Sequence, residues 1–192
     1  MKTNIIWIII VVAIVFFFVV FVSFQKKHNK AQTNIPPEKN PSLKLRETLF
    51  TKSRDELGIS EGYGSNGVYG VLMETGYKEG TASLIALSDG TTSFYFSRGG
   101  GIISGGVHEN IRNATMPFVK LADEFVGKCL PADSFPLPIN DQTIFYILTD
   151  NGVKTAAALE HDLGQNRHEF SRLFHAGQDV ITELRKTTDQ FN

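Results

Sequence analysis

Cysteine is nearly absent from this sequence, which contains a single one, Cys129. A lone cysteine forms no disulfide within its own chain, and it excludes a metal site built on several thiolates. Net charge is also missing, because acidic and basic residues almost balance, at −1 overall. Without a basic field we expect no nucleic-acid partner. The sequence also lacks H-E-x-x-H, EF-hand and phosphate-loop spacings, so we expect no metal and no cofactor.

A long apolar run is present near the N-terminus. Ile5–Val22 holds 18 consecutive apolar residues. Since about 20 residues of helix cross the hydrocarbon core of a bilayer, residues 1–24 are predicted to form a transmembrane anchor, with Ile5–Phe24 in contact with lipid. A cleaved signal peptide is the alternative, but its apolar core is shorter and ends at small residues, which this run does not provide.

The polar segment 25–40 is predicted to be a linker that contains a Pro-Pro pair. Lysines are more frequent after the apolar run than before it, with Lys26, Lys27 and Lys30 against Lys2. The positive-inside rule therefore favours a cytoplasmic C-terminal side. We expect a single-pass protein of the cell membrane whose soluble domain, residues 41–192, lies in the cytoplasm.

The soluble domain alternates runs of strands with single helices. A helix is predicted to begin at Asn40-Pro41, because asparagine is a good cap and proline fits the first turn, and to end at Gly58. Asp89-Gly90 and Asn151-Gly152 are typical of tight hairpin turns between neighbouring strands. The strand signals lie at Val68–Thr75, Thr81–Leu87, Thr91–Ser97, Gln142–Thr149 and Val153–Leu159.

Two further helices are predicted in this domain. Val107–Gly127 keeps helical phase across Pro117, which predicts one kinked helix. His168–Lys186 carries an apolar stripe at helical spacing. Because hairpin-linked strands argue against a parallel sheet, the sequence predicts an α+β fold with a five-stranded, mainly antiparallel sheet packed with about three helices.

The order of these elements is similar to that of the small roadblock/longin and profilin-like modules, which also pack helices on a five-stranded antiparallel sheet. Those modules divide their strands two and three, whereas this chain divides them three and two. Separately, the blocks SFYFSRGGGIISGG (93–106) and FSRLFHAGQDVI (170–181) resemble a family of uncharacterised bacterial proteins. That resemblance implies no activity, cofactor or catalytic residue.

A glycine-rich stretch, RGGGIISGG, lies between a predicted strand and a predicted helix at residues 98–106. Backbone N–H groups of such a turn and of a helix N-terminus can bind an anion, and an arginine can add a charged contact. The alternative is a structural crossover in which glycine permits positive φ and close packing, and the lysine of a phosphate loop is missing. On the first interpretation the ligand-binding residues are Arg98, Gly100, Gly101, Ser104, Gly105, Gly106 and His108.

The other candidate residues are interpreted as structural. Ser104 lacks the preceding glycine of a nucleophile elbow, so we predict no catalytic residue. His161, His168 and His175 recur at steps that rise about 10.5 Å along a helix, too far apart to share one zinc ion. The strand tyrosines are expected at a sheet edge with their hydroxyl groups in solvent; they are Tyr69, Tyr77, Tyr95 and Tyr146.

Two functions fit these features. The first is a membrane-anchored, non-enzymatic binding or scaffold module with a protein partner. The alternative is a sensor or enzyme for a small anionic ligand, such as phosphate or a nucleotide, that uses residues 98–108. The anchor, the linker and a compact domain without a catalytic constellation favour the first.

Overall fold

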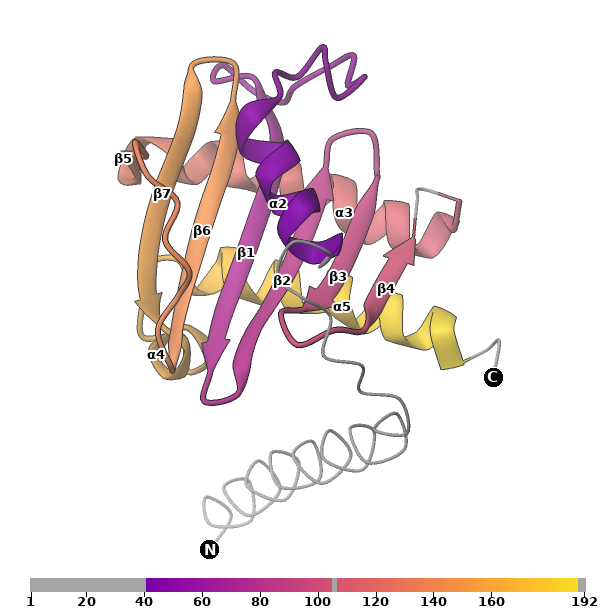
Figure 1. The fold of residues 1–192 in the computed structure, drawn as a ribbon. Helices are drawn as coiled ribbons and strands as arrows, with labels where there is room; N and C mark the ends of the chain where they lie inside the picture. Colours follow the sequence, from indigo (N-terminus) through magenta and orange to yellow (C-terminus); the bar gives the residue numbers. More distant parts are fainter. Residues whose placement is uncertain (1–40, 105–106, 190–192) are drawn as a thin grey trace, which may run out of the picture. The chain divides into compact units, whose positions relative to one another are not determined.

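The computed structural model describes residues 41–104 and 107–189 of the chain. Runs of strands alternate with helices along the chain (Figure 1). In chain order the elements are α2 (Pro41–Thr51), β1 (Val68–Tyr77), β2 (Gly80–Leu87), β3 (Thr92–Phe96), β4 (Gly101–Ser104), α3 (Glu109–Ala122), η3 (Asp123–Lys128), β5 (Leu130–Pro131), β6 (Gln142–Thr149), β7 (Gly152–Leu159), α4 (Glu160–Gly164) and α5 (Ser171–Asp189).

The strands form one antiparallel sheet in the order β4-β3-β2-β1-β6-β7-β5. β1 lies in the middle, because it pairs with β2 on one side and with β6 on the other. Both predicted hairpin turns are confirmed: Gly90 and Gly152 have φ angles of +90° and +100°, which glycine adopts without the steric cost of a side chain.

The predicted five-stranded sheet is wrong, since the sheet has seven strands. The two missed strands are short. β4 has four residues and begins with glycine, and β5 has two and ends with Pro131. Neither carries the alternating apolar pattern by which a strand is recognised, and each exists because a longer neighbour offers it backbone partners.

The predicted number of helices, about three, is also too low. In the ranges 41–104 and 107–189 there are four α-helices and one 3-10 helix. The extra α-helix is α4, which is only five residues long. The first helix ends at Thr51 rather than at Gly58, and the α-helix through Pro117 ends at Ala122, after which η3 continues the chain.

The predicted transmembrane helix, Ile5–Phe24, and the predicted linker lie outside the described residues. The part of the chain that the structure describes contains no helix that is long and apolar enough to cross a membrane.

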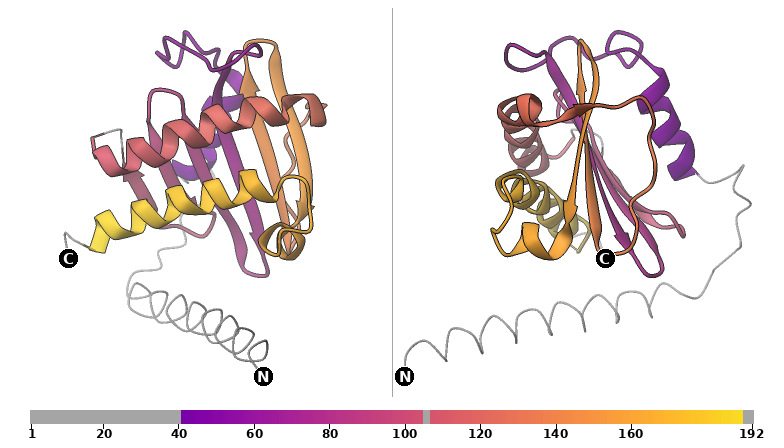
Figure 2. Two further views of the ribbon diagram at one scale, coloured as in Figure 1. Left: turned by 180° about the vertical axis from the view of Figure 1, so that it is seen from behind. Right: turned by 90° about the vertical axis from the view of Figure 1, so that its left-hand side faces the viewer.

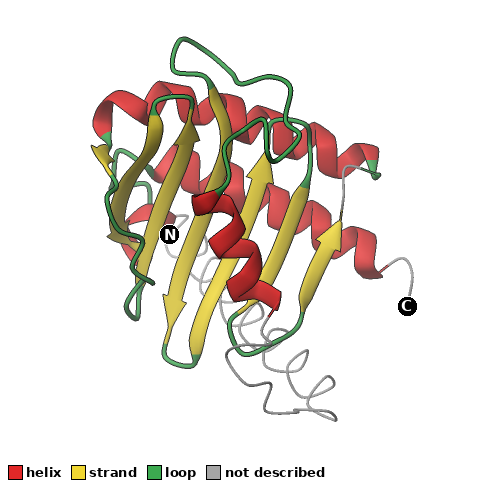
Figure 3. Cartoon of the chain, turned by 45° about the horizontal axis from the view of Figure 1, so that its top comes forward, coloured by secondary structure: helices red, strands yellow, loops and turns green. Residues whose placement is uncertain are grey.

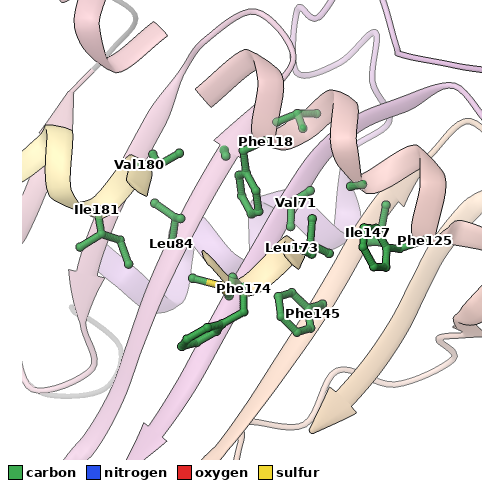
Figure 4. Packing of buried hydrophobic residues seen from close by; sticks show 14 of the residues in the cluster. Val71, Leu84, Phe118, Phe125, Phe145, Ile147, Leu173, Phe174, Val180 and Ile181 are labelled. Carbon is green, nitrogen blue, oxygen red and sulfur yellow. The ribbon is translucent and has the colours of Figure 1, made fainter. Parts of the chain in front are cut away.

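Helices cover both faces of the sheet. α3 and α5 lie on one face and α2 lies on the other (Figures 2 and 3). The larger core lies beneath α3 and α5, where aromatic and aliphatic side chains of both helices meet those of β1, β2 and β6 (Figure 4). The predicted stripe of the last helix is confirmed by the burial of Phe170, Leu173, Phe174, Val180, Ile181 and Leu184.

A second core lies on the α2 face. Leu49 and Phe50 of α2 pack there, together with Phe135 from the proline-rich connection before β6. The rings of Phe50 and Phe135 stack with their centroids 3.8 Å apart. The strand side chains beneath them include Tyr69, Leu72, Ile85, Tyr95, Ile144, Tyr146 and Leu148.

Candidate functional site

The glycine-rich stretch forms a β-hairpin rather than a direct crossover to a helix. Gly99 and Gly100 have φ angles of +102° and +83°, a region that favours glycine. Phe96 N–H donates to Gly100 O at 3.0 Å, and Gly99 N–H donates to Phe96 O at 3.0 Å. The chain then returns beside β3 as β4, so the predicted crossover begins only after Ser104.

The first of the predicted ligand residues lie in and just after the hairpin turn. Arg98 pairs with Glu79 of the neighbouring β1–β2 turn at 3.0 Å, and the two side chains are 59% and 72% exposed. Gly100 is a turn residue, and Gly101 is the first residue of β4. Arg98 is therefore an exposed, paired cation and not a charge buried in a pocket.

The other predicted ligand residues follow at the far end of β4. Ser104 is the last residue of that strand, and His108 is the N-cap of α3, where it makes no side-chain capping hydrogen bond. Gly105 and Gly106 lie outside the described residues. β4 spans roughly 10 Å, at about 3.4 Å per residue, so Arg98 and His108 lie at opposite ends of it. One small anion cannot contact both.

β4 instead forms an open edge of the sheet. Within the described ranges it pairs with β3 alone. In an antiparallel sheet, every second residue of a strand directs its N–H and C=O groups toward the same neighbouring strand. Gly100 accepts a hydrogen bond from Phe96, so Gly100 faces β3. Ile102 therefore bonds to β3, whereas Gly101 and Ile103 present their backbone N–H and C=O groups to the open side.

β4 is short, which limits strand pairing, but it carries no lysine, proline or bulge that would block it. Natural edge strands are blunted by lysine, proline or a bulge. The sequence of β4, Gly-Ile-Ile-Ser, contains no charge and no proline. Its Ile103 is 73% exposed, and Val107, three residues after the strand, is 85% exposed. The opposite edge differs, because β5 is only two residues long and contains Pro131, which has no N–H to donate, and it pairs next to Lys154.

Gly101 also ends a row of residues that crosses four strands. Glu74, Ser83, Tyr95 and Gly101 are successive partners on β1, β2, β3 and β4. A Cβ atom on Gly101 would lie 2.5 Å from the carbonyl oxygen of Phe94 and 2.8 Å from Cβ of Tyr95. Glycine at this position therefore allows β4 to lie close against β3.

A buried ion pair holds α2 to this row. The Glu74 side chain is fully buried, and Arg46 of α2 contacts it with Nε to Oε1 and Nη2 to Oε2 both at 3.0 Å. Ser83 Oγ donates to Glu74 Oε1 at 2.9 Å, and Arg46 Nη2 also donates to the carbonyl oxygen of Phe135 at 2.7 Å. Sequence reasoning missed this pair, although a lone acid inside an apolar strand, VYGVLMETGY, was a signal that a partner was needed.

Three of the four strand tyrosines are buried, so the expectation of solvent-exposed hydroxyl groups is wrong for them. Tyr69, Tyr95 and Tyr146 are 6%, 7% and 1% exposed. Tyr146 OH donates to the carbonyl oxygen of Pro136 at 2.6 Å. Burial, and then the negative charge of Glu74, raises the pKa of Tyr95 to about 12. These tyrosines belong to the second core and not to a ligand-binding face.

The described residues offer little for a metal ion or a small ligand. They include no group of three or more His, Cys, Asp and Glu side chains that could hold a metal ion. An open groove of about 320 Å³ lies between the turn before β1 and the end of α3. Both of its carboxylates already have partners: Asp123 accepts a hydrogen bond from Asn66 Nδ2 at 2.8 Å, and Glu124 pairs with Arg172. The β4 edge is therefore the stronger candidate for a binding site.

Cys129 is expected to react slowly with thiol reagents. Burial, and then the nearby carboxylate of Glu169, raises the pKa of its thiol from 9.0 to about 11. At pH 8 this lowers the reactive thiolate fraction about 100-fold, while the greater nucleophilicity of a more basic thiolate recovers about tenfold, so the reaction is roughly tenfold slower. Rates with a chromogenic disulfide reagent, for the folded chain and for the chain in urea, check this; equal rates contradict it.

Comparisons with protein-family models, with curated proteins and with solved structures found no match to this chain. We therefore infer its function from the geometry of its own residues.

Proposed function

We propose that this chain is a membrane-anchored, non-enzymatic binding module that accepts an extended segment of a protein partner as an additional strand at β4. The observation that carries the proposal is the open side of β4, where Gly101 and Ile103 direct their backbone N–H and C=O groups away from β3. An edge of this kind is the template for strand addition, in which main-chain hydrogen bonds supply affinity.

Apolar side chains support the same proposal. Ile103, one of the two residues with outward backbone groups, is 73% exposed, and Val107, three residues after β4, is 85% exposed. Covering a side chain of this size removes apolar surface from water and contributes about 1.5 kcal/mol or more. A partner strand with aliphatic side chains on the α2 face would therefore gain from both its backbone and its side chains.

The membrane part of the proposal rests on the sequence alone. The apolar run Ile5–Phe24 is long enough to contact the full hydrocarbon core of a bilayer, and the lysines that follow it favour a cytoplasmic domain. An anchored module keeps its partner at the membrane, and such a role requires no catalytic residue, no cofactor and no nucleic acid.

Ile103→Pro is expected to weaken pairing at β4 about 30-fold while the domain stays folded. The Ile103 N–H points away from β3, and proline is tolerated at such an edge position. The variant loses one intermolecular hydrogen bond and much of the apolar contact, together about 2 kcal/mol. A photoreactive amino acid at Val107 of the full chain in membranes measures the pairing as the yield of protein adducts.

The matched control places the same photoreactive group at Leu130. This residue is 72% exposed, against 85% for Val107, and it belongs to the opposite edge. Adducts at Val107 that exceed those at Leu130 and fall to the Leu130 level in Ile103→Pro support the proposal. A yield at Val107 that the proline does not change would refute it.

A further inference from the structure

We propose that the strand that pairs with β4 is the β4 strand of a second copy of this chain, so that two sheets join across a twofold axis. This inference rests on the proposed function, because both use the same open edge. It goes further by naming the partner and the register in which the two strands meet.

The outward backbone groups of β4 are self-complementary. Two identical strands that meet across a twofold axis run antiparallel, and the axis is perpendicular to the sheet. If the axis passes between the two Ile102 residues, Gly101 faces Ile103 of the second copy, and Ile103 faces its Gly101. All the outward N–H and C=O groups of both residues are then paired. A register with Gly101 opposite Gly101 instead places Ile103 opposite the turn residue Gly99, and its backbone groups lose their partners.

The side chains fit the same register. Residues directly opposite each other in an antiparallel pair point to the same face of the sheet. Ile103 of each copy therefore lies over Gly101 of the other, which has no side chain to obstruct it. Ile102 packs against the core beneath α3 and α5, so the two Ile102 side chains meet on the face that α3 and α5 cover. The exposed isoleucine and the glycine of the β4 edge are thus complementary halves of one contact.

The symmetry also keeps equivalent faces of the two domains together. An axis perpendicular to the sheet leaves both α2 helices on one face of the joined sheet and α3 and α5 of both copies on the other face (Figure 2). Both Pro41 residues, at which the described chains begin, then lie on the same face of the joined sheet.

Cysteine cross-linking in the full chain tests the register. In a Cys129→Ser background reconstituted in lipid vesicles, Ile102→Cys places two thiols in a non-hydrogen-bonded pair, where the Cα atoms lie about 4.5 Å apart, within reach of a disulfide. Ile103→Cys is the matched control, since its two Cα atoms lie roughly 9 Å apart, beyond the limit of about 7 Å. We expect covalent dimers to form at least about tenfold faster with Ile102→Cys.

Equal cross-linking of the two variants, or faster cross-linking of Ile103→Cys, overturns the register. No dimer from either variant, with thermal unfolding unchanged from the Cys129→Ser parent, overturns the second copy as the partner. The two experiments distinguish failure of the second-copy proposal from failure of strand addition at β4 itself. If Ile102→Cys gives no dimer while adducts at Val107 still depend on Ile103, the edge binds another protein. If both results are negative, the β4 edge binds neither.

Discussion

Replacing Arg46 by alanine is expected to destabilise the folded chain by about 3–5 kcal/mol, because it leaves the charge of Glu74 buried without a partner. Glu74 lies in the central strand with its side chain fully buried, and Arg46 supplies its only cation in the described part of the chain. The same substitution removes the hydrogen bond from Arg46 to the Phe135 carbonyl and the packing of its guanidinium over the ring of Phe50. α2 and the proline-rich connection would loosen together.

Far-UV circular dichroism during urea unfolding measures this effect. Tryptophan fluorescence is unsuitable, since the single tryptophan, Trp7, lies outside the described residues. Arg98→Ala is the matched control. It breaks the exposed pair with Glu79 and is expected to cost about 0.2–1 kcal/mol. A loss from Arg46→Ala no larger than that of the control would contradict a structural role for the buried pair.

A double-mutant cycle separates the ion pair from the packing of the arginine stem. Glu74→Gln in the Arg46→Ala background removes the uncompensated charge, so we expect it to recover part of the lost stability. Glu74→Gln alone is expected to destabilise the chain, because Arg46 is 14% exposed and would keep a partly buried charge without its carboxylate. Additive effects of the two substitutions would show that the two side chains do not interact.

Phe118→Ala is expected to cost about 3–5 kcal/mol of unfolding free energy, because it opens a cavity where α3 meets the sheet and α5. Phe118 is 1% exposed and lies among the side chains of the larger core (Figure 4). α5 approaches it closely, since a Cβ atom on Gly177 would lie only 3.3 Å from Phe118 Cζ. Little room is available for neighbouring groups to relax into the space that the ring leaves.

Ile103→Ala provides the contrast for Phe118→Ala. Ile103 is 73% exposed at the sheet edge, and its truncation in the isolated chain is expected to change stability by less than about 0.5 kcal/mol. Urea midpoints of the two variants at equal, low protein concentration check both values. If Phe118→Ala unfolds at the same urea concentration as Ile103→Ala, the packing of α3 against the sheet does not carry the stability assigned to it.

The glycine-rich stretch illustrates how far the sequence could be read. Its glycines predicted a position of tight turning, and Gly99 and Gly100 do turn the chain with positive φ angles. They did not indicate the direction in which the chain leaves. Ile102 and Ile103 form a strand because the turn at Gly99 and Gly100 folds them back on β3, which offers them backbone partners. The anion-binding hypothesis depended on residues 98–108 converging, and β4 separates the two ends of that segment.

The buried ion pair between Arg46 and Glu74 could not be predicted from the sequence either. Arg46 and Glu74 are separated by 28 positions, and no local rule connects a helix residue with a strand residue at that distance. The tyrosine side chains show the same limit. Their alternation in the strands was readable, but which face would be covered by α2 and the proline-rich connection was not.

The hairpin turns, the five longer strands and the apolar stripe of α5 were readable from the chain, because each depends on neighbours a few residues away. Asn151-Gly152 turns wherever it stands between two strands, and a helical stripe is set by a period of 3.6 residues. The open β4 edge, the buried Arg46–Glu74 pair and the two-sided covering of the sheet were decided by packing. The ion pair and the covering of the sheet join segments far apart in sequence, and β4 is an edge because no other described strand pairs with its open side. The partner of a buried charge, and the position of an edge, are set only when the whole sheet has formed.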